Sequence, residues 1–158
     1  MFIHSIPPIF SKDSEKLILG SFPSVISRER QFFYANDKNR FWRVIAEIYR
    51  SDLPSTIDKK TELILKNRLA LWDVIYSCDI ENSADASIKN VTANDIAGLI
   101  TKTNIKKIFV NGGKAFELYN KLVLPKVGIE AVKLPSTSPL NAAMKTDDLI
   151  DKWKIILQ

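Results

Sequence analysis

The chain has almost none of the residues from which disulfides and zinc sites are built. Its 158 residues include one cysteine, Cys78, and one histidine, His4. One cysteine excludes an intramolecular disulfide and any all-cysteine metal or iron–sulfur site within the chain. One histidine leaves no basis for a zinc cluster or a histidine-centred catalytic triad. Chemistry must therefore come from other side chains, from backbone groups or from a bound cofactor.

Long hydrophobic runs are also absent. No segment approaches the roughly twenty apolar residues of a membrane span, and residues 1–5 lack the basic and apolar regions of a secretion signal. We therefore expect no membrane association and, by default, a cytoplasmic protein. With 46% hydrophobic and 26% charged residues, the composition is that of an ordinary globular chain. The length predicts a single domain over residues 1–158.

Charge of one sign is in mild excess. The formal net charge is +5, which favours an anionic partner such as nucleic acid. On charge alone this indication is weak, because many basic domains bind nothing acidic.

Apolar runs alternate with segments of helical periodicity along the chain. We predict strands at 17–19, 69–75, 105–110 and 129–134. We predict helices over 41–48, over 55–66, from a cap at Thr92 or Asn94 through Ile100, after Gly112-Gly113, and from about Thr146 to the end. This order predicts an α/β fold, a three-layer α/β/α sandwich with a mostly parallel four-stranded sheet. Ligands of such sheets bind beyond the carboxyl ends of the strands, here in the loops after Leu19, around Asp73, at 111–113 and after Leu134.

Local patterns leave the roles of these loops open. Asn39 is an obvious helix cap, and Tyr34 could be a lid packed on the core, but both also lie where the sheet has its crevice. Asp73 at the end of an apolar strand is either a site residue or a structural cap. The hydroxyl run 136–138 suits phosphate binding as well as an ordinary turn.

Taken in order, four segments resemble the uracil-DNA glycosylase superfamily, nearest its hypoxanthine-DNA glycosylase branch. These segments are Gly20-Ser21-Phe22-Pro23-Ser24 with 34–42 (Tyr-Ala-Asn-Asp-Lys-Asn-Arg-Phe-Trp), Leu71-Trp72-Asp73-Val74, residues 83–88 (Ser-Ala-Asp-Ala-Ser-Ile), and residues 134–139 (Leu-Pro-Ser-Thr-Ser-Pro). The resemblance implies an α/β/α fold and a monofunctional enzyme that hydrolyses the N-glycosidic bond of a flipped base. It implies damaged DNA as partner, no metal and no cofactor, and we expect a monomer.

The resemblance also implies roles for single residues. Tyr34 would stack on the flipped base, Asp73 would accept a hydrogen bond from the N–H of hypoxanthine or, equally, of uracil, and Phe22 would line the base pocket. Phe22 stands where several branches carry the residue that positions the catalytic water, so that role passes to Asn39, with Asn36 as second choice. The DNA-binding residues would be Ser24, Ser136, Thr137, Ser138, Leu140 and Asn141, with Leu140 or Asn141 as a wedge.

Three alternatives remain at this point. The same chemistry could be directed at uracil or mismatched pyrimidines, or the chain could be a catalytically degenerate DNA-binding domain, as Phe22 suggests. The third alternative is an unrelated α/β enzyme that binds a phosphorylated small molecule. The resemblance also includes Ser83, Asp85 and Ser87, but the sequence suggests no physical role for them.

Overall fold

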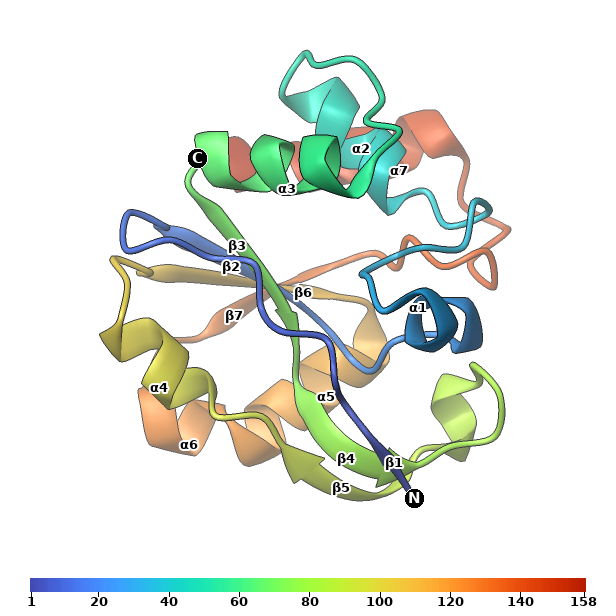
Figure 1. Ribbon diagram of the computed structural model, residues 1–158, viewed down its shortest axis with the longest axis vertical. Coiled ribbons are helices and arrows are strands. Elements are labelled where there is room, and N and C mark those ends of the chain that lie inside the picture. Colours follow the sequence, from blue (N-terminus) through green and yellow to red (C-terminus); the bar gives the residue numbers. More distant parts are fainter.

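The computed structural model describes residues 1–158 and is built around a four-stranded sheet. The strands are β2 (Lys16–Gly20), β3 (Leu69–Asp73), β6 (Lys107–Asn111) and β7 (Ala131–Leu134), in the spatial order β3-β2-β6-β7. All neighbouring pairs are parallel. Helices cover both faces (Figure 1), so the predicted three-layer sandwich is confirmed and its sheet is parallel throughout.

Strand β2 is a continuous apolar run in the sequence because both faces of the sheet are buried. Leu17, Ile18 and Leu19 are all fully buried. Ile18 packs with helices α2 (Phe41–Ile48), α3 (Ile57–Lys66) and α7 (Thr146–Trp153), whereas Leu17 and Leu19 pack with α4 (Ile96–Thr101) and α5 (Gly113–Leu122). Since each face of the sheet is covered by helices, the three apolar residues of the strand meet a core on one face or the other.

The helices follow their apolar periodicity. The predicted stripe of α2 is buried at Phe41, Val44, Ile45 and Ile48. Thr56 caps α3, because its hydroxyl accepts a hydrogen bond from the backbone N–H of Lys59 at 3.1 Å. Shorter elements complete the chain: α1 (Val25–Arg30), α6 (Leu124–Val127), and the 3₁₀ turns η1 (Asp85–Ser87) and η2 (Lys154–Leu157).

A second, three-stranded antiparallel sheet was not predicted. It consists of β1 (Phe2–Ile3), β4 (Ile75–Asp79) and β5 (Lys89–Ala93), in the order β1-β4-β5. The prediction of one strand over 69–75 was therefore wrong, since β3 ends at Asp73 and the chain changes sheets at Val74. A continuous apolar run does not reveal such a change, because both sheets bury their residues there.

Asn94 holds this junction. Its buried side-chain amide donates hydrogen bonds to the carbonyl oxygens of Asp73 at 2.9 Å and Ile75 at 3.1 Å. The predicted helix cap at Thr92 or Asn94 was therefore wrong. Asp95 caps α4 instead, because its carboxylate accepts a hydrogen bond from the N–H of Gly98 at 3.0 Å.

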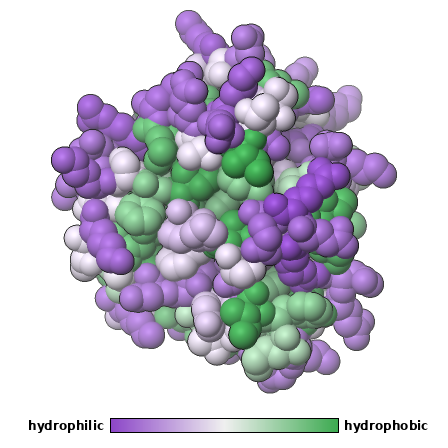
Figure 2. All heavy atoms as spheres, in the orientation of Figure 1, coloured by the Kyte–Doolittle hydropathy of each residue, from purple (hydrophilic) through white to green (hydrophobic).

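The surface is mostly hydrophilic on the face seen in Figure 2, and hydrophobic side chains gather in patches, one of them near the N-terminus. Phe2, Ile3 and Tyr76, which belong to the small sheet, are exposed. None of the helices combines the length and the apolar character needed to cross a membrane.

Candidate active site

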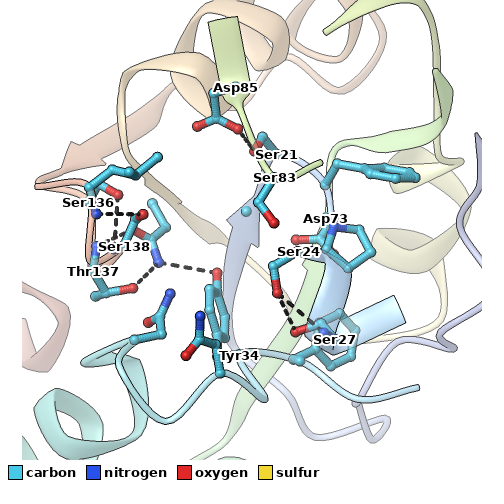
Figure 3. Close-up of a pocket in the computed structure, with 18 of the residues that line it drawn as sticks. Ser21, Ser24, Ser27, Tyr34, Asp73, Ser83, Asp85, Ser136, Thr137 and Ser138 are labelled. Carbon is cyan, nitrogen blue, oxygen red and sulfur yellow. Dashed lines mark hydrogen bonds between the residues drawn. The ribbon is translucent and has the colours of Figure 1, made fainter. Parts of the chain in front are cut away.

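A pocket of about 300 Å³ opens at the carboxyl end of the parallel sheet. It is lined by the segments that follow β2 and β7 and by the last residues of β3 and β6, as the strand order predicts, and also by the loop between β4 and β5. Figure 3 shows side chains from these separate segments pointing into one cavity. Most lining residues are polar and neutral, no lysine or arginine lines the pocket, and its two charged residues are Asp73 and Asp85. Such a pocket suits a polar ligand without negative charge.

Asp73 is buried beside this pocket and paired with His4. The Asp73 Oδ2 and His4 Nε2 atoms are 2.7 Å apart, and the two side chains are only 5% and 1% exposed. The backbone N–H of His4 donates to the carbonyl of Tyr76 at 2.6 Å, which continues the pairing of β1 with β4. We did not foresee this partner for His4, because the two residues lie 69 positions apart.

Gly20 allows Asp73 and Tyr34 to approach each other. A Cβ at position 20 would overlap Asp73 Oδ1 and would lie 2.9 Å from the hydroxyl oxygen of Tyr34. Only glycine therefore fits between the carboxylate and the phenol. The pocket consequently presents a carboxylate and a hydroxyl side by side.

Tyr34 stands in the pocket with one ring face already covered. Its ring stacks on Phe41 with centroids 4.0 Å apart and planes 15° from parallel, and its backbone has a left-handed φ of 50°. Burial, with the nearby charge of Asp73, raises the pKa of Tyr34 far above its ordinary value. The phenol therefore stays neutral. Because Asn111 Nδ2 donates to its oxygen at 3.1 Å, the phenol proton remains available to a ligand.

Both candidate asparagines line the pocket, and each is oriented by a backbone amide. Asn39 Oδ1 accepts a hydrogen bond from the N–H of Phe41 at 2.9 Å, at the start of α2, and Asn36 Oδ1 accepts one from Lys38 at 3.0 Å. The N-cap position of α2 is occupied by Arg40, so the helix-cap interpretation of Asn39 was wrong, although the Asn39 side chain accepts the first N–H of the helix. Asn39 does lie at the crevice, as a residue that lines the pocket. The side-chain nitrogen of each asparagine is left for a ligand or a water.

Phe22 and Ser24 lie on the same wall of the pocket. The ring of Phe22 is nearly buried and meets the imidazole of His4 edge-on, with centroids 6.0 Å apart and planes at 80°. Ser24 caps α1, because its hydroxyl accepts a hydrogen bond from the N–H of Ser27 at 3.2 Å. Phe22 thus shields the His4–Asp73 pair on one side.

The loop after β7 is held by its own hydroxyls and by Asn111. Thr137 is fully buried, its N–H donates to Asn111 Oδ1 at 3.0 Å, and its hydroxyl accepts from Asn111 Nδ2 at 2.9 Å. Because the hydroxyl of Thr137 accepts in this bond, its own proton remains free to donate to a ligand. Ser136 and Ser138 line the pocket. The hydroxyl of Ser136 accepts a hydrogen bond from the backbone N–H of Ser138, and the hydroxyl of Ser138 accepts one from the backbone N–H of Leu140.

Leu140 and Asn141 differ in their surroundings. Leu140 projects from the loop with 79% of its surface exposed. Asn141 braces the loop instead, since its side-chain amide donates to the carbonyl of Ser136 at 2.9 Å. The guanidinium of Arg40 donates to the carbonyls of Asn141 at 3.0 Å and Met144 at 2.6 Å. The first and last loops are therefore tied together, a role that we did not assign to Arg40 from the sequence.

Asp85, for which the sequence suggested no role, reaches the pocket from η1. Its carboxylate accepts a hydrogen bond from the hydroxyl of Ser21 at 2.9 Å. Desolvation raises the pKa of Asp85 above that of an ordinary aspartate, although the Ser21 bond and the charge of Lys114 oppose this shift. Perturbed carboxyl groups in pockets are candidates for functional residues.

Ser83 and Ser87 shape the loop that carries Asp85. The hydroxyl of Ser83 accepts a hydrogen bond from the backbone N–H of Val25 at 3.0 Å, and the hydroxyl of Ser87 accepts one from the backbone N–H of Glu81 at 2.8 Å. This loop is thereby anchored to α1 and to itself. No group of three histidine, cysteine, aspartate or glutamate side chains in the structure is placed to hold a metal ion.

Known proteins resemble the chain over nearly its whole length. A sequence profile of the Uracil DNA glycosylase superfamily matches residues 7–157. A protein of Methanosarcina acetivorans named hypoxanthine DNA glycosylase is 36% identical over 143 residues, which are 89% of each chain. One of the same name from Methanosarcina barkeri is 32% identical over 137 residues, 85% of each chain.

A solved structure resembles the fold in the same way. It is a solution NMR structure from Methanosarcina acetivorans of a protein provisionally described as a uracil DNA glycosylase. It superimposes with a TM-score of 0.82 at 32% sequence identity and covers 96% of this chain and 93% of its own.

Proposed function

Because the chain belongs to the uracil DNA glycosylase superfamily, we propose that it releases hypoxanthine from DNA by hydrolysing the N-glycosidic bond of deoxyinosine. Enzymes that act on a base must extrude it from the helix and hold it in a pocket by stacking and by hydrogen bonds to its edge. The polar pocket at the end of the sheet supports this use, since it has no cation to hold a phosphate inside. The names of the two Methanosarcina relatives support hypoxanthine as the base.

The observation that carries the proposal is the Asp73 carboxylate next to the phenol of Tyr34. An ionised carboxylate accepts hydrogen bonds and donates none, so Asp73 would receive the N1–H of hypoxanthine. The ring face of Tyr34 that Phe41 leaves free would stack on the base. Phe22 would close the pocket behind it. Uracil offers a similar N–H, so an enzyme directed at uracil or mismatched pyrimidines is the second candidate.

For the catalytic water we propose Asn39, with Asn36 as second choice. The bond from the Phe41 N–H fixes the orientation of the Asn39 amide, and a fixed amide can hold water toward C1′ of the sugar. The Phe22 ring offers no comparable hydrogen bond. The water oxygen bonds to C1′ and loses a proton to solvent as the C1′–N9 bond breaks. The electron pair departs with the base, whose negative charge is stabilised by pocket hydrogen bonds until the base takes up a proton from solvent.

The Asn39→Ala variant tests this assignment. We expect single-turnover release of hypoxanthine to fall about a hundredfold or more, as when a positioned catalytic group is removed. Asn36→Ala serves as the matched variant, and thermal unfolding of both separates lost chemistry from the lost hydrogen bond at the start of α2. Near-full release by Asn39→Ala would remove Asn39 from the role, and a loss confined to Asn36→Ala would transfer it.

We further propose that the rims of the pocket hold the DNA backbone. Ser24, Ser136 and Ser138 have hydroxyls at the opening, and Thr137 and Asn141 keep that loop in shape. Leu140, with its exposed apolar side chain, suits the wedge that fills the space a flipped base leaves. We propose that the enzyme works as a monomer, without metal or cofactor.

Base release from three otherwise identical duplexes, carrying hypoxanthine, uracil or no lesion, tests the function without added metal. We expect selective release of hypoxanthine. Preferred release of uracil would keep the chemistry and change the substrate. No release from either lesion by folded protein, with salt-sensitive DNA binding retained, would instead support a catalytically degenerate DNA-binding domain.

A further inference from the structure

The only histidine of the chain lies behind the residue proposed to read the base. His4 is held from three directions: its ring contacts Phe22 edge-on and Phe33 at a centroid distance of 6.1 Å, its backbone N–H donates to Tyr76, and its Nε2 meets Asp73. The ring is buried and does not line the pocket. His4 therefore acts on a ligand only through Asp73.

The two oxygens of Asp73 have different surroundings. Oδ2 lies 2.7 Å from the imidazole nitrogen of His4, whereas Oδ1 lies against the Cα of Gly20, close to the hydroxyl of Tyr34. We infer that His4 is a positioning residue for base recognition: by donating its Nε2–H to Oδ2 it keeps Asp73 an acceptor, so that the pocket selects bases with an N–H at the contacted edge. This inference rests on the proposed function of Asp73.

The physical reason is the cost of an unpaired buried carboxylate. A buried carboxyl group without a partner takes up a proton rather than remain charged. The imidazole of His4 is the one hydrogen-bond partner of the Asp73 carboxyl group in the structure. A proton on Nε2 makes Oδ2 the acceptor of this bond and leaves Oδ1 to accept from the base. A protonated Asp73 would donate an O–H, and its hydrogen bonding would then suit N1 of adenine, an undamaged base, rather than the N1–H of hypoxanthine.

Two variants of equal length separate this role from packing. In His4→Gln the side-chain amide can still donate to Asp73, whereas His4→Met fills a similar space and donates nothing. For His4→Met we expect single-turnover hypoxanthine release to fall about tenfold or more, which corresponds to roughly 1.4 kcal/mol of transition-state stabilisation. We also expect its ratio of hypoxanthine to adenine release to fall, and His4→Gln to retain most of both.

Binding to a duplex with an abasic-site analogue should not change in either variant, because no base is read there. Equal losses in both variants, or an unchanged ratio in His4→Met, would overturn the inference and leave His4 a packing residue. If the unmutated protein releases no hypoxanthine, the proposed function fails instead, whatever the variants do.

A measurement on the unmutated protein keeps the inference testable even if the Met variant does not fold. Because His4 is the only histidine, its ring signals in a ¹⁵N-resolved NMR spectrum need no assignment by mutation. We expect Nε2 to carry a proton at neutral pH. An unprotonated Nε2, which would make Asp73 the donor, would overturn the inference.

Discussion

At the residue scale, Gly20 sets the distance between the two groups that would contact the base. We expect Gly20→Ala to fold but to lose most of its base release, because the added methyl group overlaps Asp73 Oδ1 and displaces the carboxylate or Tyr34. Gly113→Ala is the matched control, since its Cβ would make only ordinary contacts, 3.8 Å from Lys133. Single-turnover kinetics and thermal unfolding of both variants provide the measurement. Unaltered release by Gly20→Ala would contradict a tight fit at this point.

Asp85 yields a prediction for the pH dependence of stability at the same scale. Its pKa is raised in the folded state, so its contribution is favourable below the ordinary pKa of aspartate, near 4, and is lost as pH rises through the higher folded value. At pH 7 the ionised side chain costs stability, and Asp85→Asn should raise the melting temperature. Solvent screening keeps the rise below the roughly 2–4 °C that about 1 kcal/mol produces in a domain of this size.

The difference in melting temperature between the unmutated protein and Asp85→Asn should vanish in acid, below the pKa of Asp85 in the unfolded chain, because both side chains are neutral there. Melting curves of the two proteins between about pH 3 and 8 test it. A lower melting temperature for Asp85→Asn at pH 7 would show that the Ser21 bond outweighs desolvation. Loss of base release together with gained stability would mark Asp85 as a functional residue whose charge is kept at a cost.

At the element scale, Arg40 joins the loop before α2 to the loop after β7. Its guanidinium donates to the carbonyls of Asn141 and Met144, and its backbone N–H donates to Thr137 at 3.1 Å. We expect Arg40→Met to speed amide hydrogen exchange over residues 138–146 and to weaken lesion binding, because the loop loses two fixed contacts. Arg43→Met removes the same charge from an exposed position on α2, so equal effects of both variants would attribute the change to charge alone.

At the scale of the whole molecule, the excess positive charge lies outside the pocket. The chain carries a net charge of +5, yet no lysine or arginine lines the pocket. We therefore expect salt to weaken DNA binding, with the logarithm of affinity falling by about 0.9 per phosphate contact for each unit of log salt. The single-turnover rate on saturated enzyme should change little. A strongly salt-dependent rate at saturation would mean that surface cations act in the chemical step.

The layered fold was predictable because it depends on local periodicity. Apolar runs of strand length alternate with helical stripes, and the carboxyl-end rule then brings Tyr34, Asn39, Asp73 and the 136–138 loop to one edge before any coordinates are known. The motif resemblance added the reaction class. The change of sheets at Val74 escaped prediction, because buried residues on both sides of it have the same apolar character.

The sequence by itself determined the parallel sheet, the edge where its strands end and the polar residues gathered there, since these follow from patterns within short segments. Only the tertiary structure decided which of those residues are paired. The His4–Asp73 contact joins residues 69 positions apart, the Arg40 contacts span about a hundred, and the Ser21–Asp85 bond spans 64. Hydrogen bonds between loops depend on distances and directions across the folded chain, which neither composition nor local spacing contains.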